Sequence, residues 1–183
     1  MFGWLKRGPA RPDTALAMIG SRASDDVLFL GARDPTVAAE NGTITRLNGR
    51  TVVAGQGAAD KARVEDAAGK AGAILEFVDT PLTALPFAAA TFHIVVIRDL
   101  ALGSADATPV VAEAMRVLQP GGRIILIFGE PARGMLSALN PPPTPAADTV
   151  VILLQRVGFA AARRLAEEAG VSYFEARKAR AES

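Results

Sequence analysis

The sequence predicts a single α/β domain whose mainly parallel sheet is covered by helices on both faces. Its 183 residues are half apolar and 21% charged, which suits one folded domain with a sizeable core. Short apolar runs rich in β-branched residues alternate with helical segments, as in a sheet that is buried on both faces. Right-handed crossovers then give a doubly wound sheet with its ligand crevice at the carboxyl ends of the strands.

Five apolar runs are too short for buried helices of ordinary length, and we interpret them as strands. They are residues 26–31, 50–55, 73–78, 91–97 and 123–128. The first two end on a glycine, which suits a tight turn into the next element. The sequence therefore predicts at least five strands in alternation with helices.

Helices are expected between and after these runs. They are residues 58–71, 108–118 and 148–157, together with a helix that begins at Asp34 and Pro35. Aspartate is a favoured helix cap and proline is favoured at the first helical position, although Gly42 weakens the middle of this helix or splits it. Pro120 and the two glycines after it are expected to end the helix of residues 108–118 and reverse the chain into the next strand.

Composition excludes several classes of function. The net charge of +1 gives no basis for nucleic-acid binding or for an acidic membrane surface. The absence of cysteine excludes disulfides, thiolate metal sites and cysteine nucleophiles, no metal site is predicted, and a cytoplasmic location is expected. No segment has the roughly 18 apolar residues of a membrane-spanning helix. Residues 1–25 are expected to form a tail or short helix before a domain of residues 26–183.

Three stretches carry a family resemblance when taken in order. They are LPFAAATFHIVVI (85–97), EAMRVLQPGGRIILI (113–127) and LLQRVGFAAARRLAEEAGVSYFEARK (153–178). They resemble the LPF turn and strand, the E-x-x-RVLKPGG helix and turn, and the closing hairpin of class I S-adenosylmethionine-dependent methyltransferases, in particular the type 11 group. The resemblance implies a Rossmann-like sheet of seven strands with an antiparallel C-terminal hairpin. Propensity alone would make the first half of that hairpin a helix.

The resemblance also implies a cofactor site, and the sequence departs from the family there. The family has an acidic residue and G-x-G-x-G after the first strand, whereas LFLGARDPT retains Gly31 alone. Phe29 stands at the acidic position, and Arg33 and Pro35 replace the other two glycines. Asp34 is expected to cap the next helix, and its charge would repel the methionine carboxylate of S-adenosylmethionine. The alternative is that Arg33 pairs with that carboxylate.

The residues that would hold the ribose and adenine are displaced as well. The second strand ends on Gly55 and neutral Gln56 where the family has an acidic residue. Pro81 takes the place of an adenine-contacting acid, with Asp79 two residues away. His93 replaces an aspartate, and a lone histidine that opens a strand is usually structural. The candidate cofactor-binding residues are Gly31, Arg33, Gln56, Asp79 and Asp99.

Three functions remain open from the sequence. The first is a methyltransferase-like pseudoenzyme with a degenerate site, acting as a non-catalytic partner or scaffold subunit through its N-terminal tail or the proline-rich segment 140–145. The second is an active S-adenosylmethionine-dependent methyltransferase with an atypical pocket and an unknown acceptor. The third, a nucleotide-binding oxidoreductase, is the weakest because no complete G-x-G-x-x-G is present.

Overall fold

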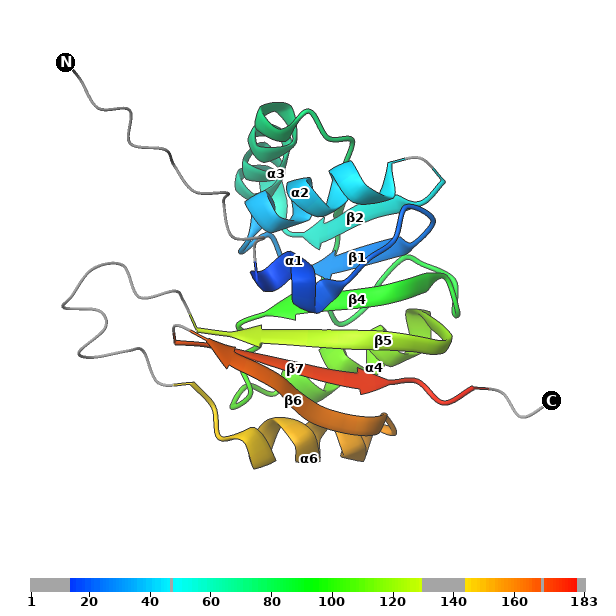
Figure 1. The fold of residues 1–183 in the computed structure, drawn as a ribbon, viewed down its shortest axis with the longest axis vertical. Coiled ribbons are helices and arrows are strands. Elements are labelled where there is room, and N and C mark those ends of the chain that lie inside the picture. The colour runs from blue at the N-terminus through cyan, green and yellow to red at the C-terminus, as the bar shows by residue number, and fades with distance from the viewer. Residues whose placement is uncertain (1–13, 47, 130–143, 169, 181–183) are drawn as a thin grey trace, which may run out of the picture.

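The seven strands form one sheet (Figure 1). The computed structural model describes residues 14–46, 48–129, 144–168 and 170–180. The strands are β1 (Asp26–Leu30), β2 (Arg50–Gly55), β3 (Glu76–Asp79), β4 (Phe92–Arg98), β5 (Leu118–Phe128), β6 (Ala160–Glu168) and β7 (Val171–Arg177). Their order is β3-β2-β1-β4-β5-β7-β6, parallel from β3 to β5 and antiparallel at β7 and β6. The predicted Rossmann-like sheet with an antiparallel C-terminal hairpin is confirmed.

Helices cover both faces of this sheet. They are α1 (Thr14–Ile19), α2 (Pro35–Thr45), α3 (Gly57–Ala71), α4 (Ala107–Val117) and α6 (Ala147–Val157). One face packs against α1, α2 and α3, with Ile19, Val37 and Val64 in its core. The other face packs against α4 and α6, with Val111 and Leu154 in its core. Because both faces are buried, the central strands are apolar throughout rather than alternating. In the described part of the chain, no helix combines the length and apolarity needed to cross a bilayer.

The start of β3 differs from the prediction, and Gly42 does not split α2. Residues 73–75 lie outside β3 because Gly72 ends α3 in the left-handed conformation (φ 63°) and the N–H of Ala73 donates to a carbonyl of that helix. The side chain of Ile74 in this link is 85% exposed. A Cβ on Gly42 would lie 2.8 Å from Leu75 Cδ2, so glycine lets the link approach α2 closely.

The PGG segment lies inside β5 rather than before it. The strand begins at Leu118, directly after α4, and its pairing with β4 shifts register across the segment. Gly121 has a φ of 81°, which favours glycine. A Cβ on Gly122 would lie 2.9 Å from the backbone oxygen of Gln119 and 3.0 Å from that of His93. Residues 119–122 have no partner in β4, whereas Gly121 and Gly122 exchange backbone hydrogen bonds with Lys178. The irregularity that the glycines permit therefore lies inside β5, and the prediction that it precedes the strand was wrong.

Replacing Gly122 by alanine is expected to lower the free energy of unfolding by about 2 kcal/mol, because the added methyl group meets backbone oxygens that cannot rotate away. Gly69→Ala is the matched control, since nothing lies within 4 Å of its Cβ position in α3. The control is expected to raise the stability by about 0.5–1 kcal/mol. Urea unfolding measures both values, and equal changes in the two variants would contradict the packing described for Gly122.

A polar clamp joins the LPF segment to α4. Arg116 donates to the backbone oxygens of Phe87 (2.7 Å) and Leu85 (3.0 Å) and to Glu113 Oε1 (2.7 Å). Glu113 Oε2 accepts the N–H of Leu85 at 2.8 Å. The hydrogen bonds from Arg116 hold the pKa of Glu113 below its usual value. Two of the stretches that carry the family resemblance are thus bound to each other, and their polar residues serve the fold.

Candidate functional site

A cavity of about 380 Å³ lies at the carboxyl ends of β1 and β4. Its walls come from the β1–α2 loop, the start of α3, the segment after β3 and the segment between β4 and α4. β1, β2, β4 and β5 all point toward this edge, on the left in Figure 1. Doubly wound sheets bind ligands at this edge, and the volume lies in the ordinary range for small-molecule sites.

Four of the five predicted site residues line this cavity. They are Gly31, Arg33, Gln56 and Asp99. Asp79, the fifth, does not line it. Its Oδ1 instead accepts the N–H of Gly57 at 3.1 Å, at the first residue of α3. The structure therefore brings together the residues that follow β1, β2 and β4, and it gives Asp79 a backbone partner at a helix start.

An ion pair joins two of the residues that line the cavity. Arg33 Nε lies 3.6 Å from Asp99 Oδ2, and the Arg33 side chain is 64% exposed. Asp99 has a φ of 50°, and its Oδ1 accepts the N–H of Gly129 at 3.0 Å. The β1–α2 loop is thus joined to the end of β4 by opposite charges, with Asp99 held by the backbone that follows β5.

The start of α2 is closed by its own carboxylate. Asp34 Oδ1 accepts the N–H of Val37 at 3.3 Å, so the predicted helix cap is confirmed. Its Oδ2 accepts from Arg98 Nη1 at 2.7 Å, and Arg98 Nη2 donates to the backbone oxygen of Gly129 at 2.8 Å. Sequence reasoning missed Arg98, although a cation at the end of an otherwise apolar strand was visible. At this helix start, the N–H of Val37 and the carboxylate of Asp34 therefore already have partners within the chain.

Phe29 points away from the cavity. Its side chain is buried in the core beneath α1 and α2, with Val27 and Val53. The neighbouring residues Leu28 and Leu30 lie in the core on the opposite face. Strand alternation therefore makes the position that is acidic in the family a packing position here.

Asp60 is a second residue that sequence reasoning missed. It lies in the first turn of α3, its Oδ2 accepts the N–H of Gln56 at 3.0 Å, and its other oxygen pairs with Arg63. The Gln56 hydrogen bond is the main cause that lowers the pKa of Asp60, so the group is ionised at neutral pH. A Cβ on Gly55 would lie 3.0 Å from Asp60 Oδ2. This carboxylate therefore lies beside the end of β2, and only its position in a first helical turn could have indicated it.

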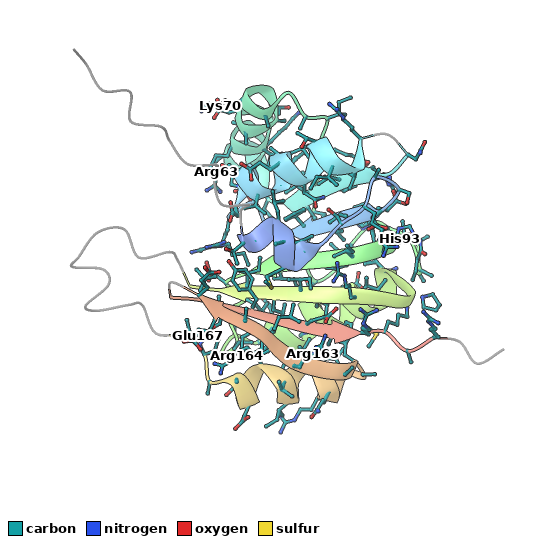
Figure 2. All side chains as sticks on the ribbon, in the orientation of Figure 1. Arg63, Lys70, His93, Arg163, Arg164 and Glu167 are labelled. Carbon is teal, nitrogen blue, oxygen red and sulfur yellow. The ribbon has the colours of Figure 1, made fainter. Side chains whose placement is uncertain are left out.

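His93 lies at the other edge of the sheet. Its Nδ1 accepts the N–H of Asp26 at 3.0 Å, between the starts of β4 and β1. Figure 2 shows His93 at one edge and Arg63, which lines the cavity, at the opposite edge. This hydrogen bond agrees with the structural role expected for the histidine. Over the described residues, no group of three or more His, Cys, Asp or Glu side chains could hold a metal ion.

The comparisons with known proteins agree with this architecture. A family model described as a methyltransferase domain matches residues 41–126, whereas no curated protein sequence matches the chain. The chain is similar to the structure of a SAM-dependent methyltransferase from Aquifex aeolicus, with a TM-score of 0.72 at 14% identity, covering 90% of this chain and 87% of that one.

Two further solved structures share the fold. The YcgJ protein from Bacillus subtilis has a TM-score of 0.70 at 13% identity, covering 91% of this chain and 97% of that one. The [4+2]-cyclase SpnF has a TM-score of 0.69 at 16% identity, covering 92% and 79% respectively. The strand order and these neighbours show that the chain has the fold of S-adenosylmethionine-dependent methyltransferases, and the methyltransferase-domain model matches the part of the chain from α2 to β5.

Proposed function

We propose that this chain is a methyltransferase-fold protein with a degenerate cofactor site, and that it acts as a non-catalytic partner or scaffold subunit. The proposal is based on two ion pairs at the crevice, one between Asp34 and Arg98 and one between Arg33 and Asp99. Both lie on the loops where the methionine end of S-adenosylmethionine would have to bind. The family model supports the proposal because its match, residues 41–126, begins after the β1–α2 loop.

The described residues do not fit the methionine carboxylate in the ordinary way. A helix start usually offers free amides and a partial positive charge to an anion. Here Asp34 takes the N–H of Val37 and adds a negative charge, while Arg98 is committed to Asp34 and to the Gly129 backbone. Breaking one charge-assisted hydrogen bond to admit the cofactor would weaken binding by about tenfold or more. We derive no methyl-transfer step through this site.

The described end of the proline-rich segment, Thr144 and Pro145, shares a cavity with Asp99 of the crevice. The N-terminal tail lies mostly outside the described residues, as does most of segment 140–145, of which Thr144 and Pro145 are described. These two residues line a second cavity, of about 320 Å³, together with Leu100, Leu102 and Asp99. We therefore propose that a partner bound to the proline-rich segment would contact the crevice rather than a remote face.

One observation favours the alternative, an active methyltransferase with an atypical pocket. Arg33 and Asp99 carry opposite charges in the cavity lining, and they would match the carboxylate and ammonium of a zwitterionic methionine group if their own pair opened. Asp60 supplies a carboxylate beside the end of β2, where the family has an acidic residue. In that case these residues bind and orient the cofactor, which supplies the methyl group.

A calorimetric titration with S-adenosylmethionine distinguishes the two functions. Arg33→Gly with Asp34→Ser restores a glycine and removes the negative charge, while serine can still cap α2. We expect this variant to give measurable heat at millimolar ligand where the wild type gives none, because a cation and a repelling carboxylate have both been removed from the path of the ligand.

The matched control is Asp148→Ser with Arg156→Ala, which removes the same two charges from α6. We expect no gain in affinity from the control. If the double variant at Arg33 and Asp34 instead bound the cofactor more weakly than the wild type, Arg33 would be a cofactor ligand and the non-catalytic function would be rejected.

A further inference from the structure

We propose that a cavity at the amino edge of the sheet binds a small ligand that carries several phosphate groups. The cavity has a volume of about 550 Å³ and lies between His93, the PGG segment of β5 and the chain that follows β7. Figure 2 shows His93 at this edge, opposite the crevice edge marked by Arg63. The inference does not depend on the proposed function, because the two cavities share no lining residue.

The cavity is strongly cationic although the whole chain has a net charge of only +1. Its lining includes four arginines, Arg22, Arg123, Arg177 and Arg180, and one acidic residue, Asp25. Asp25 Oδ2 already accepts the backbone N–H of Arg22 at 2.8 Å. Guanidinium groups present forked N–H donors that match the oxygens of a phosphate. An excess of such groups in one cavity therefore favours a multiply charged anion.

A buried glutamate organises the arginines on one side of this cavity. Glu175 is only 4% exposed, and its carboxylate lies 3.5 Å from Arg123 Nη1, 3.1 Å from Arg163 Nη2 and 3.3 Å from Arg177 Nη2. One negative charge among three guanidinium groups leaves two positive charges without a counter-ion in this cluster. Arg123 is also held by the backbone oxygens of Ile19 and Gly20. Arg123 is therefore held in place on two sides, whereas Arg177 is more exposed and is joined to the cluster through Glu175, and Arg163 lies outside the cavity lining.

Further donors complete the cavity. Arg22 and Arg180 are exposed, and no ion pair joins either of them to another described residue. The side chain of Arg180 lies over Gly121, where its Cγ would be 3.3 Å from an added Cβ. His93 Nδ1 accepts a hydrogen bond from Asp26, so the proton of the neutral ring lies on Nε2, which is a donor. These groups can donate to a ligand without breaking an ion pair.

The lining favours a small phosphorylated molecule over a nucleic acid. Binding of single strands relies on aromatic side chains that stack on the bases, and the cavity lining contains no Phe, Tyr or Trp. The four arginines are gathered in this one cavity. Inorganic triphosphate is the probe that carries the proposed chemistry without a base or a sugar.

The test is a calorimetric titration of the full chain with triphosphate at low ionic strength. Arg177→Gln with Arg180→Gln removes two exposed cations from the cavity, and Glu175 keeps Arg123 and Arg163 as partners. We expect this variant to bind about tenfold more weakly or worse, since each lost charge-assisted hydrogen bond accounts for about that factor. The control, Arg156→Gln with Arg164→Gln, removes the same charge from α6 and β6 and is expected to bind like the wild type.

Three results would overturn the proposal. They are no binding of triphosphate by the wild type, equal loss of binding in the two double variants, and tighter binding of a single-stranded RNA oligonucleotide through the same arginines. Circular dichroism and thermal unfolding show whether each variant is folded. Added S-adenosylmethionine is expected to leave triphosphate binding unchanged. A failure of the phosphate-site proposal can therefore be distinguished from a failure of the proposed function.

Discussion

Replacing Arg116 by methionine is expected to lower the free energy of unfolding by about 3 kcal/mol, although the new side chain keeps most of the apolar stem. The variant loses charged hydrogen bonds to the backbone oxygens of Leu85 and Phe87 and to Glu113. It also leaves the partly buried carboxylate of Glu113 without its cation. Urea unfolding at neutral pH measures the loss. Arg156→Met, on the exposed face of α6, is the control and is expected to change stability by less than about 0.5 kcal/mol.

The same clamp predicts a dependence of stability on pH. Arg116 holds the pKa of Glu113 below its usual 4.5 in the folded chain, so the ionised form is favoured by folding. This contribution is fully present above the unfolded-state pKa and is lost as the pH falls through the lower folded-state pKa. The stability difference between the wild type and Glu113→Gln is therefore expected to shrink below about pH 4.5. A difference that stays constant down to pH 3 would contradict an ionised clamp.

Replacing Glu175 by glutamine is expected to cost about 3 kcal/mol of stability, because three arginines lose the single buried carboxylate among them. Arg163 and Arg177 are half-exposed or more and can turn to solvent, whereas Arg123 is held by backbone oxygens near α1. The expected loss therefore comes mainly from Arg123. Thermal and urea unfolding give the value.

Glu167→Gln is the control for this prediction. Glu167 lies on β6, pairs with Arg164 and is about half-exposed, so its loss is expected to cost less than about 0.5 kcal/mol. Equal losses in the two glutamate variants would show that burial of Glu175 does not organise the arginine cluster. A second substitution, Arg123→Met in the Glu175→Gln background, is expected to recover part of the stability, because it removes the most buried of the unpaired cations.

Periodicity and helix-end chemistry predicted most of the fold. The apolar runs and the Asp34–Pro35 helix start are local signals, and α3, α4 and α6 end within a residue of the expected positions. The start of β3 was missed because the cap at Gly72 uses the amides that follow it. β6 has helical propensity, and only its pairing with β7 makes it a strand. Long-range pairing of this kind is not visible in local sequence.

The site was less predictable than the fold. Gly31, Arg33, Gln56 and Asp99 follow strand ends, and parallel strand ends meet at one edge, so their gathering around one cavity follows from topology. The hydrogen bonds of Arg98, by contrast, depend on partners far along the chain, at Asp34 and Gly129. Side-chain pairing between separate elements leaves no periodic trace in the sequence.

The residues that carry the family resemblance differ from the residues that line the crevice. The proposed function is based on this difference. Two features explain why the matched region keeps the family's sequence pattern. The first is the clamp that joins Glu113 and Arg116 to the LPF segment, and the second is the pair of glycines in the PGG segment. Both hold the fold together. None of these groups needs a ligand. The loop that would meet the cofactor carries Arg33 and Asp34, whose charges are paired within the chain.

The degenerate cofactor site is tested most directly by calorimetric titration of the wild-type chain with S-adenosylmethionine, with thermal shift as a second readout. We expect neither measurable heat nor stabilisation at millimolar ligand, because the ion pairs at Asp34 and Arg33 would have to open for the methionine end to bind. A dissociation constant in the micromolar range, with the stabilisation that tight binding brings, would contradict this expectation and identify the chain as a cofactor-binding methyltransferase.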